Sequence, residues 1–100
     1  MAVVFVTIAP LGTATPSLSK YVAGVQKVLR ASGLTHQMTA MGTIIEGDLD
    51  RILQVVREMH EHPFAEGAVR VSTLIKIDDR RDKEHTIEGK MRSVQEKLNQ

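Results

Sequence analysis

The spacing of the apolar residues alternates along this chain between the period of a strand and the period of a helix. Residues 2–9 are dense in β-branched side chains at both parities, which is typical of a strand covered on both faces. Residues 18–29 instead repeat apolar side chains at intervals of three and four, as in an amphipathic helix. Two predicted strands follow at 34–41 and 43–47, and a second apolar stripe of helical period runs from residue 49 to residue 59.

Residues that begin or end regular structure stand at the boundaries of these segments. Ser17 and Asp48 are placed to cap the two helices, because a short oxygen-bearing side chain can accept a hydrogen bond from the first helical turn. Gly33 is predicted to end the first helix, and Gly42 to join or bulge the two strands, because glycine tolerates backbone conformations that other residues avoid. The run 60–63 ends in proline and predicts the end of the second helix.

The C-terminal third of the chain predicts one more strand and one more helix. Apolar and polar residues alternate over 67–79, which predicts a strand with one buried and one solvated face. A final helix is predicted over 86–98. The order β-α-β-β-α-β predicts one domain over residues 1–100, an α+β ferredoxin-like sandwich with an extra C-terminal helix. The first and third strands of this fold are central, and both helices between the strands cover the same sheet face.

The opposite face of the predicted sheet would carry apolar residues of the first strand. An exposed apolar patch of this kind usually marks an interface. Packing of two sheets against each other would cover the patch, and the final helix could clamp a neighbouring subunit. We therefore expect a closed homo-oligomer, with a dimer of dimers as the preferred form.

The composition excludes several classes of function. Thirteen Lys and Arg balance twelve Asp and Glu, which argues against a nucleic-acid-binding surface. The chain has no cysteine, and no apolar run reaches the roughly 18 residues of a membrane span. The glycines form no phosphate-binding loop, and His60 and His62 lack the spacing of a helical zinc site. We expect a cytoplasmic protein with no cofactor, no metal, and neither a membrane nor a nucleic acid as partner.

A charged segment, 78–84, separates the last strand from the last helix. Its Arg80, Arg81 and Lys83 could bind an anion. The alternating signs favour a network of ion pairs, either solvated or between subunits.

Polar side chains stand where a strand core would prefer hydrocarbon. Thr7, Thr39, Thr43 and Glu46 place three hydroxyls and one carboxylate on neighbouring strands of the predicted sheet. These groups can simply be satisfied by local hydrogen bonds. Alternatively, clustered beside Met41, they would orient a small heteroaromatic ligand, with Glu46 accepting a hydrogen bond from an exocyclic amine.

Four segments in their order and spacing resemble the thiamine-binding protein family of small YkoF-like, ferredoxin-like domains. They are Pro10-Leu11-Gly12-Thr13, the segment 17–23, Met41-Gly42-Thr43-Ile44-Ile45-Glu46-Gly47 and the segment 70–83. The resemblance covers nearly the whole chain. It implies a homotetramer that binds thiamine, or its hydroxymethylpyrimidine half, without transforming it.

The resemblance also implies which residues contact the ligand. In the block that begins at Met41, the resemblance implies that Met41, Gly42, Thr43 and Glu46 contact the ligand. The polar-pocket argument adds Ser19 and Thr39. Tandem members of the family pair two such domains in one polypeptide, so in a single-domain chain the second half must come from another copy.

Two other functions stay open at this point. One is a small hydrolase or isomerase that uses Glu46 as a base, because one fold can host many chemistries. The other is a regulatory or scaffold oligomer whose Arg80, Arg81 and Lys83 contact a protein partner.

Overall fold

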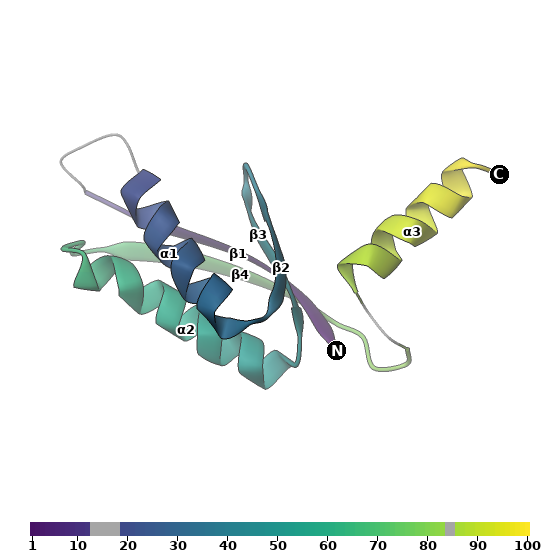
Figure 1. The fold of residues 1–100 in the computed structure, drawn as a ribbon, viewed down its shortest axis with the longest axis horizontal. Coiled ribbons are helices and arrows are strands. Elements are labelled where there is room, and N and C mark those ends of the chain that lie inside the picture. The colour runs from purple at the N-terminus through teal and green to yellow at the C-terminus, as the bar shows by residue number, and fades with distance from the viewer. Residues whose placement is uncertain (13–18, 84–85) are drawn as a thin grey trace.

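The structure, a computed structural model, describes residues 1–12, 19–83 and 86–100 (Figure 1). Its regular elements have the order expected from the periodicity. The predicted cap Ser17 lies outside the described residues. The elements are β1 (Ala2–Pro10), α1 (Ser19–Ser32), β2 (Thr35–Thr39), β3 (Gly42–Gly47), α2 (Leu49–Ala65), β4 (Val71–Asp79) and α3 (Ile87–Leu98).

The four strands form one antiparallel sheet in the order β2-β3-β1-β4. The first and third strands are central, as predicted, and the fold is ferredoxin-like with an added C-terminal helix. Helices α1 and α2 lie side by side over one face of the sheet (Figure 1). β1 pairs with β4 from Ala2 to Pro10, but its pairing with β3 ends at Val6. The final residues of β1 therefore have a hydrogen-bonded strand on one side only.

The core lies between this sheet face and the two covering helices. Alternate residues of β1, namely Ala2, Val4 and Val6, point into it because successive side chains of a strand face opposite sides. Full burial of each aliphatic side chain contributes about 1.5–3 kcal/mol to folding. The other buried members of the core are Val25, Leu29, Ile45, Ile52, Val55, Val56 and Met59.

Most predicted boundaries are confirmed, with local hydrogen bonds as their cause. The Asp48 side chain accepts from the Arg51 N–H at 3.2 Å and caps α2. Gly33 follows α1 with φ +76°, a left-handed conformation that favours glycine. The turn between β2 and β3 consists of residues 40 and 41, so Gly42 is the first residue of β3 rather than the turn itself.

Two predictions about α2 and β4 are wrong. Helix α2 continues through Pro63 to Ala65, because Pro63 lies in the last turn and its ring is fully buried in the core. The carbonyl of Pro63 accepts the N–H groups of Glu66 and Ala68, which closes the helix. Gly67, with φ +104°, follows in the turn, and β4 begins only at Val71.

The apolar face of β4 is also less buried than the alternation predicts. Ile75 and Ile77 are 40% and 45% exposed. β4 is an edge strand, so one of its sides has no neighbouring strand, and α2 covers only part of its inner face.

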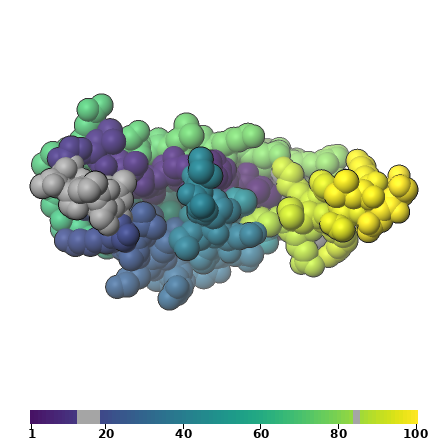
Figure 2. Space-filling model, turned by 90° about the horizontal axis from the view of Figure 1, so that it is seen from above, coloured from purple at the N-terminus to yellow at the C-terminus, as the bar shows by residue number. Residues whose placement is uncertain are grey.

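The second face of the sheet, here called the open face, carries Val3 and Phe5 of β1 and Ile44 of β3. Helix α3 begins over this face and then extends beyond the end of the sheet (Figures 1 and 2). None of its residues is buried, and the molecule measures 51 × 28 × 20 Å. Ile87 at the start of the helix is half-buried, but the apolar residues that follow on the same side, Met91, Val94 and Leu98, are exposed in a single subunit.

Candidate functional site

A polar hollow lies where β1 and the β2–β3 hairpin separate. The two strands are paired up to Val6 and Thr43, and beyond that point β1 follows β4 while the hairpin turns away. The space between them, closed by α1 and by Met59 of α2, is a cavity of about 190 Å³. We call it the hairpin cavity. Its lining includes four of the predicted site residues, Thr39, Met41, Gly42 and Thr43.

A hydrogen-bonded pair from two elements provides the polar part of the hairpin cavity. Gln26 of α1 donates through Nε2 to Oγ1 of Thr43 at 2.9 Å, and Thr43 is only 5% exposed. The Thr43 hydroxyl can still donate its own proton, and the Gln26 carbonyl oxygen can still accept one. The pair therefore offers a donor and an acceptor to a ligand in the cavity.

Flexible apolar side chains border this polar pair. Met41 and Met38 are 81% and 60% exposed although they line the hairpin cavity, and Val22 is 42% exposed. Met59 is fully buried behind them. Because the methionine side chain is unbranched and polarizable, it can adapt to the face of a planar ring.

A second hollow continues from the hairpin cavity along the outer side of α1. It has a volume of about 560 Å³ and shares Val22, Gln26 and Met38 with the cavity. Ser19, another predicted site residue, lines this second hollow. The structure thus brings five of the six predicted residues to two adjoining spaces.

Thr39 has its hydrogen-bonding capacity used within the hairpin turn. Its hydroxyl donates to the Gly42 carbonyl at 2.7 Å and accepts from the N–H groups of Met41 and Gly42 at 3.2 and 3.1 Å. Thr39 therefore shapes the cavity wall by holding the turn. For Thr39, the expectation that a strand hydroxyl is satisfied by local hydrogen bonds is therefore met.

Glu46, the sixth predicted residue, lies on the other side of the sheet. Thr43 and Glu46 are three positions apart in one strand, so their side chains point to opposite faces. The Glu46 carboxylate accepts the N–H of Ile87 at 2.5 Å, at the first turn of α3. The Thr43 and Glu46 side chains therefore do not meet within a subunit. The sequence already indicates this, because two strand residues an odd number of positions apart face opposite sides of the sheet.

The segment 78–84 contains ion pairs where the structure describes it. Arg80 binds Asp82 at 2.6 Å and Arg81 binds Asp79 at 2.8 Å. The hydrogen bond from Arg80 lowers the pKa of Asp82 to about 2. These pairs favour the ion-pair interpretation over an anion site.

The histidines have local partners too. His60 shares a hydrogen bond with Thr73 at 2.6 Å, and His62 lies 2.5 Å from Glu66. Residues 1–12, 19–83 and 86–100 contain no group of three or more side chains that could hold a metal ion. Within those same ranges, no helix is both long and apolar enough to cross a membrane.

Gln26 is the functional candidate that the sequence reasoning missed. It stands at helical spacing from Val22 and Leu29, so it interrupts the apolar stripe of α1 with an amide. A polar residue on such a stripe must find a partner when buried, which is a signal for a polar contact with the sheet. The partner itself, Thr43, could be identified only in the folded chain.

Comparisons with known proteins agree with this fold over more than nine-tenths of the chain. The sequence model of a family described as "Thiamine-binding protein" matches residues 4–95. The UPF0045 protein YqgV of Bacillus subtilis is 51% identical over 102 residues, covering 98% of both chains. The crystal structure of the hypothetical protein MJ1052 of Methanocaldococcus jannaschii has a TM-score of 0.86 and 42% identity, covering 95% of this chain and 96% of that one. A Thermotoga maritima protein described as a candidate for thiamine biosynthesis or salvage shares the fold at 19% identity, with a TM-score of 0.77 and coverage of 93% and 97%.

Proposed function

This chain belongs to the thiamine-binding protein family, and we propose that it binds thiamine or a related hydroxymethylpyrimidine in the hairpin cavity without transforming it. The observation that carries the proposal is the Gln26–Thr43 pair beside the methionine side chains of the hairpin. Both partners of this pair come from elements that only the fold brings together.

The chemistry of the pair matches an aminopyrimidine. The edge of this ring presents an exocyclic amine, which donates, beside a ring nitrogen, which accepts. The Gln26 carbonyl oxygen would accept from the amine, and the Thr43 hydroxyl would donate to the ring nitrogen. Met38, Met41 and Val22 would contact the ring faces.

The same lining supports binding rather than catalysis. The described residues around the hairpin cavity are apolar or are Thr, Gln and Gly, and they include no Asp, Glu, His, Lys, Tyr or Cys. General acid–base catalysis needs a group of the latter kind within reach of the substrate, and a threonine hydroxyl acts as a nucleophile only when such a group activates it. The alternative of a hydrolase or isomerase based on Glu46 requires that carboxylate to serve a site on the open face.

Oligomerisation is part of the proposal. The hairpin cavity is smaller than the roughly 300–1,000 Å³ of a typical ligand site, and the exposed methionines leave its mouth open. We propose a homotetramer in the cytoplasm, in which a neighbouring subunit covers the open face and the stripe of α3.

Isothermal titration with thiamine and with hydroxymethylpyrimidine tests the proposal. We expect binding by the wild type and a loss of at least about tenfold in affinity for Gln26→Ala and for Thr43→Val, since a buried ligand group then lacks its partner. Gln54→Ala is the matched control, because Gln54 is an exposed amide on α2 that contacts Arg51.

Two results would contradict the proposal. One is an absence of binding heat for both ligands at millimolar concentration. The other is unchanged affinity in folded Gln26→Ala and Thr43→Val.

Glu46→Gln, titrated in the same way, tests the expectation that Glu46 contacts the ligand. Unchanged affinity would mean that Glu46 only anchors α3. If the wild type turns over a ligand, and Glu46→Gln loses this turnover but still binds, the alternative of a hydrolase or isomerase based on Glu46 is favoured instead.

A further inference from the structure

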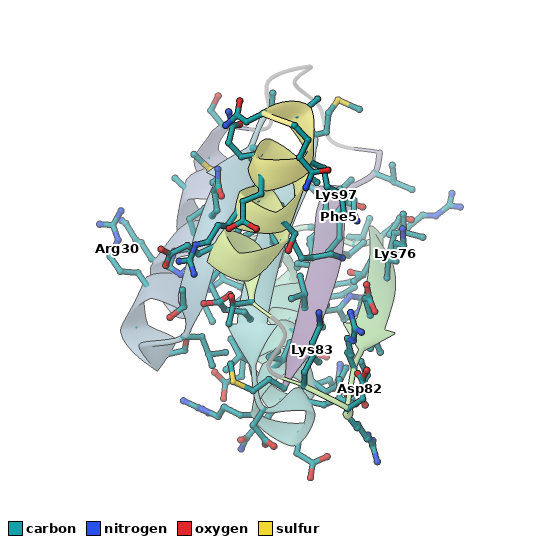
Figure 3. The ribbon with its side chains drawn as sticks, turned by 90° about the vertical axis from the view of Figure 1, so that its right-hand side faces the viewer. Phe5, Arg30, Lys76, Asp82, Lys83 and Lys97 are labelled. Carbon is teal, nitrogen blue, oxygen red and sulfur yellow. The ribbon has the colours of Figure 1, made fainter. Side chains whose placement is uncertain are left out.

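Two cations line the second hollow beside the hairpin cavity. Lys27 and Arg30 are one helical turn apart on α1, and both are exposed. Figure 3 shows Arg30 extending outwards from the helix. We call the hollow lined by Ser19, Val22, Ala23, Gln26, Lys27, Arg30 and Met38 the basic groove.

The charge around the basic groove is of one sign. The first 45 residues of the chain contain Lys20, Lys27 and Arg30 but no Asp or Glu, and all twelve acidic residues stand at or after Glu46. The elements that form the groove, α1 and β2, lie entirely within that acid-free part. The balanced net charge of the whole chain conceals this asymmetry.

The two cations also differ from others on the surface in having no ion pair or hydrogen bond with the described residues. By contrast, Arg57, Arg92 and Lys90 pair with Glu61, Glu88 and Asp78. The carboxylate that reaches α1, Glu66, pairs with His62 beside Gly24, on the side of the helix that packs against α2. The basic groove lies on the other side of α1.

From this arrangement we propose that the basic groove binds the phosphate group of a phosphorylated ligand whose ring occupies the hairpin cavity. The inference rests on the proposed function, because the two spaces share Val22, Gln26 and Met38 in their linings and therefore adjoin. The Arg30 guanidinium can bind two phosphate oxygens at once, and Lys27 adds a point charge. Ser19 adds a hydroxyl at the same groove.

The groove would discriminate between forms of the ligand. Thiamine carries a fixed positive charge on its thiazolium ring, so the unphosphorylated vitamin gains nothing from Lys27 and Arg30. A phosphate monoester reverses the sign of the interaction. Hydroxymethylpyrimidine phosphate, which has no thiazolium, should gain most from the groove.

Isothermal titration of the full chain with four probes tests the inference: thiamine, thiamine monophosphate, hydroxymethylpyrimidine and hydroxymethylpyrimidine phosphate. At about 20 mM NaCl we expect each phosphate to bind about fivefold to tenfold more tightly than its parent, and the advantage to shrink at about 300 mM NaCl. Lys27→Ala/Arg30→Ala should abolish the advantage, leave the affinity for hydroxymethylpyrimidine unchanged and not weaken the affinity for thiamine. Arg57→Ala/Lys97→Ala, which removes two exposed cations elsewhere, is the matched control.

The outcomes separate this inference from the proposed function. Equal affinity for parent and phosphate, or an advantage that survives Lys27→Ala/Arg30→Ala, would overturn the phosphate groove and leave the ring site standing. No binding of any of the four probes would overturn both. Competition by inorganic phosphate for the phosphates but not for the parents would support the inference. Circular dichroism and the melting temperature check that the double variant is folded, which we expect because both side chains are exposed.

Discussion

At the residue scale, Gly42 shows how closely the hairpin approaches the central strand. A Cβ at this position would overlap the ring of Phe5 and come within 2.8 Å of the Thr7 methyl group. Glycine at the first residue of β3 therefore leaves room for the Phe5 ring and the Thr7 methyl group of the neighbouring strand. The sequence predicts Gly42 as a turn or bulge. Glycine is needed there for another reason, because the ring of Phe5, 37 positions away in sequence, occupies the space of a Cβ.

Gly42→Ala should accordingly destabilise the fold by about 1–3 kcal/mol, the usual range for overpacking. Urea unfolding followed by circular dichroism measures the change. Phe5→Leu provides the second arm of a double-mutant cycle, since a smaller side chain leaves room for the added methyl group. Equal cost of Gly42→Ala in both backgrounds would show that the Phe5 ring is not the obstacle.

At the element scale, two helices are capped in the same way but have different importance for the fold. Asp48 caps α2, whose inner side is buried in the core. The Thr86 side chain accepts from the Gly89 N–H at 2.9 Å and, with Glu46, anchors the first turn of α3, which has no buried residue. A carboxylate at a helix N-terminus is also favoured by the helix dipole.

Asp48→Ala should therefore lower the global free energy of unfolding by about 1 kcal/mol, whereas Glu46→Gln should act locally. For Glu46→Gln we expect faster hydrogen exchange at the amides of 87–90 with little change in the urea midpoint. Hydrogen exchange monitored by NMR distinguishes the two. Equal exchange in wild type and variant would mean that Glu46 does not hold α3.

The prediction of each element from the sequence succeeded where the cause is local. Asp48 and Gly33 act on backbone groups within four residues, so their effect is visible in the sequence. Pro63 was misread because proline normally stops a helix, whereas its burial against the core is a tertiary fact.

At the scale of the whole molecule, the open face is only partly covered within a subunit, and the apolar side of α3 is largely exposed. The open face is touched at one end by Ile87 and Met91 of α3, while Val94 and Leu98 are 58% and 72% exposed further along the helix. An elongated molecule with an amphipathic helix whose apolar side is exposed is unusual for an isolated domain of this size. A neighbouring copy would cover both surfaces.

Val94→Asp should therefore shift the expected tetramer towards smaller species, because a charge would be buried at the contact. Gln95→Asp is the control, since it adds the same charge at the next position of the same helix. Size-exclusion chromatography with light scattering measures the mass. A wild type that is monomeric at every protein concentration would contradict the oligomer.

The amino-acid sequence by itself determined the order of the elements, the central position of β1 and most helix ends, because periodicity and capping are properties of neighbouring residues. It also indicated Met41, Gly42 and Thr43, which are contiguous in the chain. Only the tertiary structure decided that Gln26 meets Thr43, that Glu46 turns away to α3, and that Lys27 and Arg30 line the hollow next to the hairpin cavity. The physical reason is that a site assembled from several elements depends on strand register and on how each helix is rotated against the sheet, and those are set by packing across the whole core.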